Sequence, residues 1–358
     1  MKRMTMFIFV CLAVLVMSCG DQRDTSNPSI LFRVVVDGKV GYIDKSGDMV
    51  IKPQFDAVST GSFYEGLAYT SVWTGVYYNN ARLGKYGYID ATGKIVINPQ
   101  FDLVDNFSEG LATVCIDHKC GYIDKTGKIV IDLQFDGASR FSEGLAAVRI
   151  RGKDGYSKYG YIDTTGKIVI NLQFDDTSPF SEGLAKVKID DKYGYIDKSG
   201  KIVINPQFNI LADDFSEGLA VVKIDDKYGY IDKSGKIVIN PQFDFAANFY
   251  DGLAEVTIGD KTGYIDKTGK IVIDLQFILA NRFSEGLASV KVGDKYGYID
   301  KSGKIVISPQ FKDTDNFSDG LAQVKPGFDS RRIKNNRQMP MNPIATAPCV
   351  DGVVLLQN

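Results

Sequence analysis

The chain contains 358 residues, and its 42 Lys and Arg against 44 Asp and Glu give no electrostatic reason to expect nucleic acid as a partner. The only histidine is His118, which excludes Ser-His-Asp triads, histidine-rich zinc sites and histidine general bases. With 36 Gly, 19 Tyr and 21 Phe but one Trp, the composition favours a strand-rich, turn-rich fold, and 44% hydrophobic residues are enough for a core.

Residues 1–18 have the order of a secretory signal peptide, with a basic start, an apolar run and small residues at the end. The apolar run, residues 4–17, is shorter than the roughly 20 residues that a transmembrane helix needs. Residues 16–19 resemble a bacterial lipobox, although methionine is not the usual residue at the second position. This resemblance implies that the signal peptide is cleaved before Cys19 and that Cys19 is then lipid-modified. An ordinary signal peptide or an uncleaved anchor is the alternative. We therefore expect an exported, cell-envelope protein that is lipid-anchored to a membrane or held at the extracellular surface, with residues 19–29 as a polar tether.

Residues 30–327 repeat one unit eight times. The sequence Gly-Tyr-Ile-Asp first occurs at Gly41 and last at Gly297, and Glu/Asp-Gly-Leu-Ala recurs between Glu65 and Asp319. The usual spacing is 34 residues, and two units carry long insertions. Such a period is typical of solenoids and propellers, in which each unit buries its apolar surface against its neighbours.

The unit resembles the WG (KWG) repeat of bacterial envelope and secreted proteins. The consensus of that repeat is close to Trp-Gly-Tyr-Ile-Asp, then Gly, an Ile/Val strand, Pro-Gln-Phe and Phe-Ser-Glu-Gly-Leu-Ala, and the match runs from Leu31 to Lys325. The resemblance implies a repeat architecture and a role in interaction, and it brings no catalytic motif. The signature Trp is replaced in the eight copies by Val40, Tyr86, Cys120, Tyr159, Tyr193, Tyr228, Thr262 and Tyr296.

Each unit is predicted to contain a β-hairpin. Segments 219–224 and 227–232 are rich in Val, Ile and Tyr and are separated by two turn-forming residues. The residues that flank these turns change together between copies, which supports one register: the pairs include Val35 with Val40, Cys115 with Cys120, and Thr257 with Thr262. The sequence Asp-Lys-Ser/Thr-Gly then predicts a second turn into a Lys-Ile-Val-Ile strand, which Pro or Leu is expected to end before Gln-Phe.

Three strands per unit predict an all-β meander repeat, since no segment beyond the signal peptide has the period of a helix. The register predicts that Ala220, Val222 and Ile224 lie on the buried face, and that Phe243 and Phe249 fill the junction with the next unit. We expect the eight units to form an elongated, β-solenoid-like array. A closed β-propeller is the alternative, although three strands are fewer than the usual four of a blade.

Little in the chain points to chemistry. Turn formation explains the many Asp residues better than calcium binding, and the glycines form no phosphate-binding loop. We therefore expect no metal, no cofactor and no catalytic residue, so the protein is predicted not to be an enzyme. His118 lies in a predicted turn and is interpreted as a turn residue. Cys115 and Cys120 face each other across that turn and predict a disulfide in an exported protein, with two reduced thiols as the alternative.

Function is expected where the copies differ, because the shared residues, including the signature tyrosines, serve the scaffold. The hairpin between Tyr69 and Tyr86 is 12 residues longer than the others. Its tip region is predicted to contact a partner through Trp73, Tyr77, Tyr78 and Arg82. The alternative is that the same aromatic rings are buried in an N-terminal cap.

Two further segments are distinctive. The hairpin at residues 149–159 is five residues longer than the basic unit, and residues 328–358 form a basic tail that ends in an apolar, possible cap strand. Together these features predict a lipid-anchored envelope protein whose repeat surface binds an unidentified protein or glycan ligand. A structural spacer or, less favoured, an envelope hydrolase are the alternatives.

Overall fold

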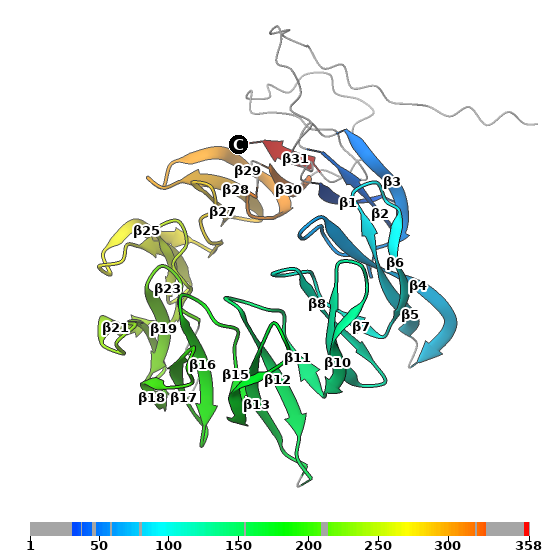
Figure 1. The fold of residues 1–358 in the computed structure, drawn as a ribbon. Helices are drawn as coiled ribbons and strands as arrows, with labels where there is room; N and C mark the ends of the chain where they lie inside the picture. Colours follow the sequence, from blue (N-terminus) through cyan, green and yellow to red (C-terminus); the bar gives the residue numbers. More distant parts are fainter. Residues whose placement is uncertain are drawn as a thin grey trace, which may run out of the picture.

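The computed structural model describes residues 31–36, 38–44, 48–57, 59–78, 81–153, 155–208, 214–318, 321–326 and 354–357. Throughout these residues the chain forms strands, turns and short loops, without a helix. Eight antiparallel sheets follow one another around a ring in chain order (Figure 1). The predicted all-β repeat is confirmed. Of the two arrangements derived from the sequence, the structure has the ring of the propeller alternative and not the elongated array.

The first two sheets have three strands each, β1 (Phe32–Val36), β2 (Lys39–Ile43) and β3 (Met49–Asp56), then β4 (Leu67–Tyr78), β5 (Ala81–Asp90) and β6 (Ile95–Phe101). The next three sheets have four strands, β7 (Leu103–Val104), β8 (Leu111–Ile116), β9 (Lys119–Asp124) and β10 (Ile129–Phe135), then β11 (Gly137–Ala138), β12 (Leu145–Arg151), β13 (Ser157–Asp163) and β14 (Ile168–Phe174), then β15 (Asp176–Thr177), β16 (Leu184–Ile189), β17 (Lys192–Asp197) and β18 (Ile202–Phe208).

The sixth sheet comprises β19 (Leu219–Ile224), β20 (Lys227–Asp232) and β21 (Ile237–Phe243), and the seventh comprises β22 (Phe245–Ala246), β23 (Ala254–Ile258), β24 (Lys261–Ile265) and β25 (Ile271–Phe277). The eighth contains β26 (Leu279–Ala280), β27 (Leu287–Val292), β28 (Lys295–Asp300), β29 (Ile305–Thr314), β30 (Leu321–Pro326) and β31 (Val354–Gln357). We call the eight long-stranded meanders units one to eight; unit four is β12–β14 and unit six is β19–β21.

The register of the first hairpin in each unit is as predicted. Val35 pairs with Val40, Cys115 with Cys120, and Thr257 with Thr262. In unit six the two turn residues, Asp225 and Asp226, have positive φ angles of 48° and 63°. Asp tolerates this left-handed conformation, which the tight turn between twisted strands requires. Local turn chemistry therefore explains this pair of acidic residues.

The second turn is held by the Asp that ends the Gly-Tyr-Ile-Asp strand. In unit six the Oδ1 of Asp232 accepts hydrogen bonds from the backbone N–H groups of Ser234 (2.9 Å) and Lys236 (3.1 Å) and from the Ser234 hydroxyl (2.6 Å). The hydroxyl bond holds the pKa of the Asp232 carboxyl below its usual range. The same bonds recur around Asp90, Asp124, Asp163, Asp197, Asp266 and Asp300. These aspartates therefore serve the turns.

The third strand runs through its proline, so the prediction that Pro or Leu ends it was wrong. Strand β21 continues through Pro241 to Phe243, and its pairing with β20 shifts register between Ile239 and Phe243. Proline is accommodated because an irregular edge strand leaves its nitrogen without a required partner. The strand also passes very close to Gly229, where an added Cβ would lie 2.5 Å from the Ile239 carbonyl oxygen. The glycine of Gly-Tyr-Ile-Asp is therefore a steric requirement.

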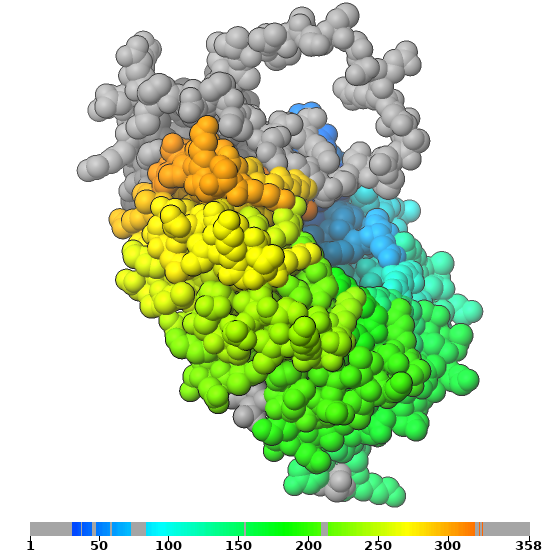
Figure 2. All heavy atoms as spheres, turned by 90° about the vertical axis from the view of Figure 1, so that its left-hand side faces the viewer, coloured from blue at the N-terminus to red at the C-terminus, as the bar shows by residue number. Residues whose placement is uncertain are grey.

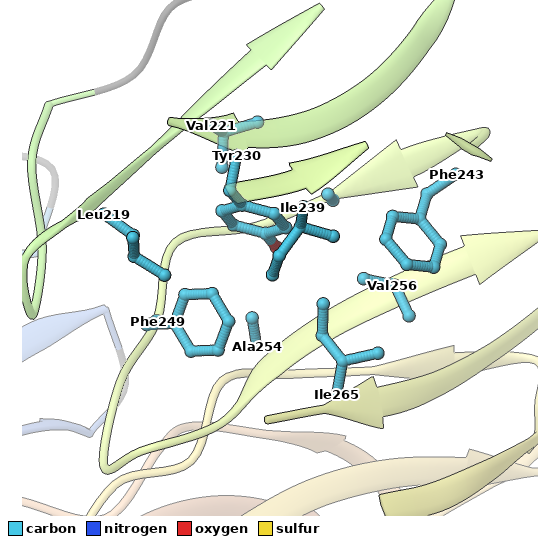
Figure 3. Packing of buried hydrophobic residues seen from close by; sticks show 10 residues of the cluster. Leu219, Val221, Tyr230, Ile239, Phe243, Phe249, Ala254, Val256 and Ile265 are labelled. Atoms are coloured by element: carbon cyan, nitrogen blue, oxygen red, sulfur yellow. The ribbon is translucent and has the colours of Figure 1, made fainter. Parts of the chain in front are cut away.

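The sheets stack face to face, so both faces of a unit are buried. On the predicted buried face Ala220 and Val222 are both 0% exposed as expected, whereas Ile224 is only half-buried, and Tyr230 on the opposite face is also 0% exposed. Figure 3 shows the junction between units six and seven, where Phe243 and Phe249 fill the space as predicted. Figure 2 shows neighbouring units in continuous contact along the side of the ring. Stacking on both sides gives each unit the burial that one sheet alone lacks.

A short fourth strand was not predicted. The two residues of β22 follow unit six but pair with β23 of unit seven, at Phe245 with Thr257 and Ala246 with Val256. Strands β7, β11, β15 and β26 join the following units in the same way. Four strands are the usual number of a propeller blade, and a two-residue strand has no periodicity that a sequence could reveal. Because the sequence predicted only three strands per unit, it favoured the elongated array over a propeller.

Repeated polar residues bond each unit to the next. The Ser216 hydroxyl donates to the Phe249 carbonyl oxygen (2.7 Å), and the Gly252 N–H donates to the Glu217 carboxylate (3.2 Å). Lys267 also pairs with Glu217, at 3.0 Å. A hydrogen bond of this kind contributes about 1 kcal/mol, whereas an exposed ion pair contributes less. The Phe-Ser-Glu-Gly sequence is thus a structural joint between units.

The end of the chain extends the eighth sheet. Strand β30 pairs with β29, and β31 pairs with β30, with Ala322 opposite Leu356. Strand β31 thus takes the place beside β30 that a Gly-Tyr-Ile-Asp strand takes in each unit. Of the basic tail, residues 328–353 and 358 lie outside the described part. Among the described strands, β1 and β31 belong to different sheets, although both lie at the same part of the ring in Figure 1.

Candidate interaction sites

The residues common to all units are used inside the structure. The signature tyrosines are at most 1% exposed, and they are Tyr42, Tyr88, Tyr122, Tyr161, Tyr195, Tyr230, Tyr264 and Tyr298. In unit six the Tyr230 hydroxyl donates to the Ala247 carbonyl oxygen at 2.7 Å, and burial raises the pKa of this phenol. The rings pack at a steep angle against the loop phenylalanines, as Tyr230 does on Phe249 with 4.9 Å between ring centroids and 57° between ring planes. These tyrosines serve the core and are inaccessible to a ligand.

Unit three contains the disulfide between Cys115 and Cys120. The Sγ atoms are 2.10 Å apart and the Cα atoms 4.0 Å apart, and the two residues pair directly across β8 and β9. In unit seven the same positions hold Thr257 and Thr262, whose hydroxyls are 2.9 Å apart and share a hydrogen bond. Either pair joins the two strands beside the turn.

No chemical site accompanies the disulfide. His118 lies in the adjoining turn, exposed and with a φ of 63°. Within the described ranges no group of three or more His, Cys, Asp or Glu side chains is arranged to hold a metal ion. In the same ranges no helix is long and apolar enough to cross a membrane. The residue predicted to carry lipid, Cys19, and the predicted signal peptide and tether lie outside the described residues.

The long hairpin of unit two is formed by β4 and β5. Its pairing extends to Tyr77 with Arg82 and Tyr78 with Ala81, and it shifts register between Trp73 and Val76. Strand β4 has 12 residues, whereas β8 in the next unit has six. The backbone thus places the four predicted contact residues on the extended part of the hairpin. Their side chains lie outside what the structure describes, so contact with a partner stays a prediction.

The hairpin of unit four is the second long one. Strands β12 and β13 pair as far as Arg151 with Ser157, and the tip projects beyond the neighbouring sheets in Figures 1 and 2. Two hollows lie beside it. The larger hollow, of about 580 Å³, is lined by Tyr156, Ser157, Lys158, Tyr159 and Asp175. The smaller hollow, of about 220 Å³, is lined by Gly137, Ala138, Ser139, Ala147, Arg149, Tyr159, Thr177 and Pro179. Tyr159 lines both, so the hollows adjoin.

Near the smaller hollow, unit four has small or polar residues where unit six has large ones. In unit six Val221 is 3% exposed, and the ring of Phe245 lies 6.0 Å from the ring of Tyr228. Unit four has Ala147 at the place of Val221 and Asp176 at the place of Phe245. Fewer side-chain atoms leave the space open beside the aromatic ring. The hairpin could be identified from the sequence, but these two substitutions could not, since their effect on the surface depends on how the sheets stack.

Arg149 enters the smaller hollow from β12. Its Nη2 donates to the Asp136 carbonyl oxygen at 2.8 Å, while its Nε is buried without a hydrogen-bond partner. A Cβ on Gly137 would lie 3.1 Å from this Nε, so the glycine gives the guanidinium its room. Buried donors are rarely left unpaired, because each costs about 1–3 kcal/mol. Arg149 therefore adds a permanent cation to the lining of the smaller hollow, while its Nε is enclosed by the surrounding atoms.

Antiparallel sheets stacked in a ring, with differences concentrated in hairpins, define a β-repeat protein whose common residues are structural. A family model described as "WG containing repeat" matches residues 41–71, 86–120, 121–153, 159–193, 193–228, 228–261, 263–296 and 296–325, and the chain belongs to this family. The predicted resemblance is confirmed by this match. No curated protein matches the chain.

Among solved structures, Hsv2 of Kluyveromyces lactis is similar with 12% identity and a TM-score of 0.38, covering 61% of this chain and 87% of Hsv2. A form of the same protein with loop 6CD replaced by a Gly-Ser linker gives the same identity and TM-score. PorZ of Porphyromonas gingivalis, an essential surface component of the type-IX secretion system, is 11% identical with a TM-score of 0.33, covering 89% of this chain and 53% of PorZ. Such distant likenesses carry no argument about function.

Proposed function

We propose that this protein is a non-catalytic binding scaffold of the cell envelope, anchored by lipid on Cys19. It would contact a protein or glycan partner where its units differ. The observation that supports this most strongly is the division of labour between residues common to all units and residues that differ between units. The shared Tyr, Phe, Ser and Glu residues are used in the core and in the joints between units, whereas unit four carries a projecting hairpin and two hollows. Surfaces that vary on a rigid repeat are the usual place for recognition.

A non-catalytic role is supported by the chemistry of the residues. The described part holds no group of three or more His, Cys, Asp or Glu side chains arranged to bind a metal ion, and the cysteines of unit three are joined to each other. The aspartates that recur in every unit accept hydrogen bonds within their own turns. A hydrolase would need an acid and a base in one cleft, whereas the one carboxylate that lines the hollows of unit four, Asp175, is paired with Lys158 at 2.6 Å.

Partner binding is tested with the fragment 20–358, which lacks the signal peptide and the anchor residue. It is applied to a glycan array and used as bait for proteins solubilised from the cell envelope. A saturable, specific partner supports the proposal. Turnover of an envelope polymer would replace it with an enzyme, and silence in both assays would leave a structural spacer.

The lipid anchor is tested separately on the full chain. Mass spectrometry of the intact N-terminus should find acyl chains on Cys19, and Cys19→Ala should move the protein out of the membrane fraction. An unmodified N-terminus that begins after residue 19, or a Cys19→Ala protein that stays with the membrane, would contradict the anchor without affecting the binding proposal.

A further inference from the structure

We infer that the two hollows of unit four form one binding site for an acidic glycan, with Arg149 receiving a sugar carboxylate in the smaller hollow and Tyr156 and Tyr159 supporting neighbouring sugar rings. This inference rests on the proposed binding function and names its site and the class of its ligand. It is carried by the two adjoining hollows, by Arg149 in the lining of the smaller one and by the mixed aromatic and polar lining of the larger one.

Arg149 is the cation that lines the smaller hollow. Its Nη2 donates to the Asp136 carbonyl oxygen, and the Asp136 carboxylate, which pairs with Lys119 at 2.6 Å, also attracts the guanidinium and so shares its charge between two cations. Asp176, the nearest acid of the following loop, accepts a hydrogen bond from the Tyr193 hydroxyl of unit five at 3.2 Å. A guanidinium is suited to bind a carboxylate, because its donors match the two carboxylate oxygens. The smaller hollow, of about 220 Å³, has room for one such group and not for a large ligand.

The larger hollow extends this site along the hairpin. It contains no aliphatic side chain, and its lining combines two aromatic rings with Ser157, Lys158 and Asp175. Tyr156 is 74% exposed. Lys158 and Asp175 pair at 2.6 Å, so this hollow adds little net charge while it offers both donors and acceptors. Sugar hydroxyls need donors and acceptors together, and the apolar faces of sugar rings pack on exposed aromatic rings.

An acidic peptide is the competing ligand, and the lining favours the glycan. A peptide bound to a β-sheet protein usually adds a strand to a free edge or inserts an apolar anchor into a pocket. The larger hollow has no aliphatic lining for such an anchor. The smaller one offers mainly Gly and Ala beside Arg149. A sugar carboxylate with stacked neighbours uses Arg149 and the two tyrosines that line the hollows.

The test uses the mature protein and three probes: oligogalacturonate, its methyl ester, which lacks the negative charges, and oligoglutamate. Two variants change the site. Ala147→Val fills the smaller hollow with the residue that unit six carries, buried, at the same place, and Arg149→Gln removes the cation. The matched control is Lys223→Gln, because Lys223 occupies the place of Arg149 in unit six, where its Nζ lies 5.6 Å from the ring of Tyr228.

Oligogalacturonate is expected to bind, with affinity at least about tenfold lower in either site variant and unchanged in the control. The ester should also bind at least about tenfold more weakly. Equal binding of the ester, or unchanged affinity in Ala147→Val, would overturn the inference, as would binding of oligoglutamate alone. If no probe binds, the inference fails, but the broader binding function stands or falls on the array and envelope experiments. Melting curves identify a variant that has lost its fold, and Ala147→Val keeps the test valid if Arg149→Gln unfolds.

Discussion

Glu255 should make the stability of the protein depend on pH near neutrality. It lies in β23 opposite Tyr264, where unit six has Val221, and its Oε2 is buried without a hydrogen-bond partner. Burial raises the pKa of this carboxyl from 4.5 to about 7. Because each pH unit corresponds to about 1.4 kcal/mol, keeping the ionised carboxylate in the folded protein costs at most about 3 kcal/mol. Partial exposure of the side chain makes this an upper value.

The sign of this pH dependence follows from which state, folded or unfolded, keeps the proton on Glu255. Between pH 4.5 and 7 the folded protein keeps a proton on Glu255 that the unfolded chain has lost, so the free energy of unfolding falls as pH rises through this interval. Above pH 7 both states are ionised and the loss is complete. The aspartates of the turns, such as Asp232, have lowered pKa values and act in the opposite direction, but only in more acidic solution. A window of pH 5 to 8 therefore isolates Glu255.

The assay is urea unfolding of the wild-type protein and of Glu255→Gln across this window. The wild-type protein should lose up to about 3 kcal/mol between pH 5 and pH 8, and the variant should lose much less and be the more stable protein at pH 8. Asp294→Asn, which removes an acid from an exposed turn, is the control and should follow the wild-type curve. Parallel curves for wild type and Glu255→Gln would refute the reasoning that burial controls this carboxyl.

Three further predictions follow from the repeated geometry. Gly229→Ala should lower the free energy of unfolding in urea by at least about 2 kcal/mol, because the added Cβ meets the backbone of β21. Gly293→Asp should be nearly neutral, since Asp225 has a similar φ at the same turn position. Equal effects of the two substitutions would contradict the steric argument. Thiol labelling of the native exported protein should modify Cys349 but neither cysteine of unit three, and three reactive thiols would exclude the disulfide. Three aromatic residues of the unit-two hairpin, Trp73, Tyr77 and Tyr78, are replaced together by Ser. Partner binding should be lost at an unchanged melting temperature. A melting temperature lower by several degrees, with binding intact, would show instead that the hairpin is a cap.

The sequence was sufficient for the unit and its hairpin register. Two-residue turns leave little freedom in pairing, and pairs such as Cys115 with Cys120 and Thr257 with Thr262 change together for a physical reason, since they touch across the strands. The junction role of Phe249 was also predictable, because it recurs at a fixed place in a loop that must connect two units. These features depend on contacts close together in the chain.

The arrangement of the units could not be predicted from the sequence of one repeat, because it depends on contacts between units. Strand β22 has only two residues, and it joins a unit other than the one it follows. Burial of Tyr230 on the second face depends on stacking between sheets, and the hollow beside Tyr159 is lined by Ala147 and Thr177, which lie in neighbouring sheets. Contacts between units therefore decide both the ring and the candidate site.

The most direct test of the central claim, that function lies where the units differ, removes both long hairpins from one protein. The tips of β4–β5 and β12–β13 are replaced by the Asp190-Asp191 turn of unit five, whose φ angles of 47° and 63° suit a two-residue connection. Binding of the partner identified with fragment 20–358 is then measured alongside circular dichroism and the melting temperature. We predict an unchanged β spectrum and melting temperature with binding lost. Unchanged affinity in the shortened protein would contradict the account.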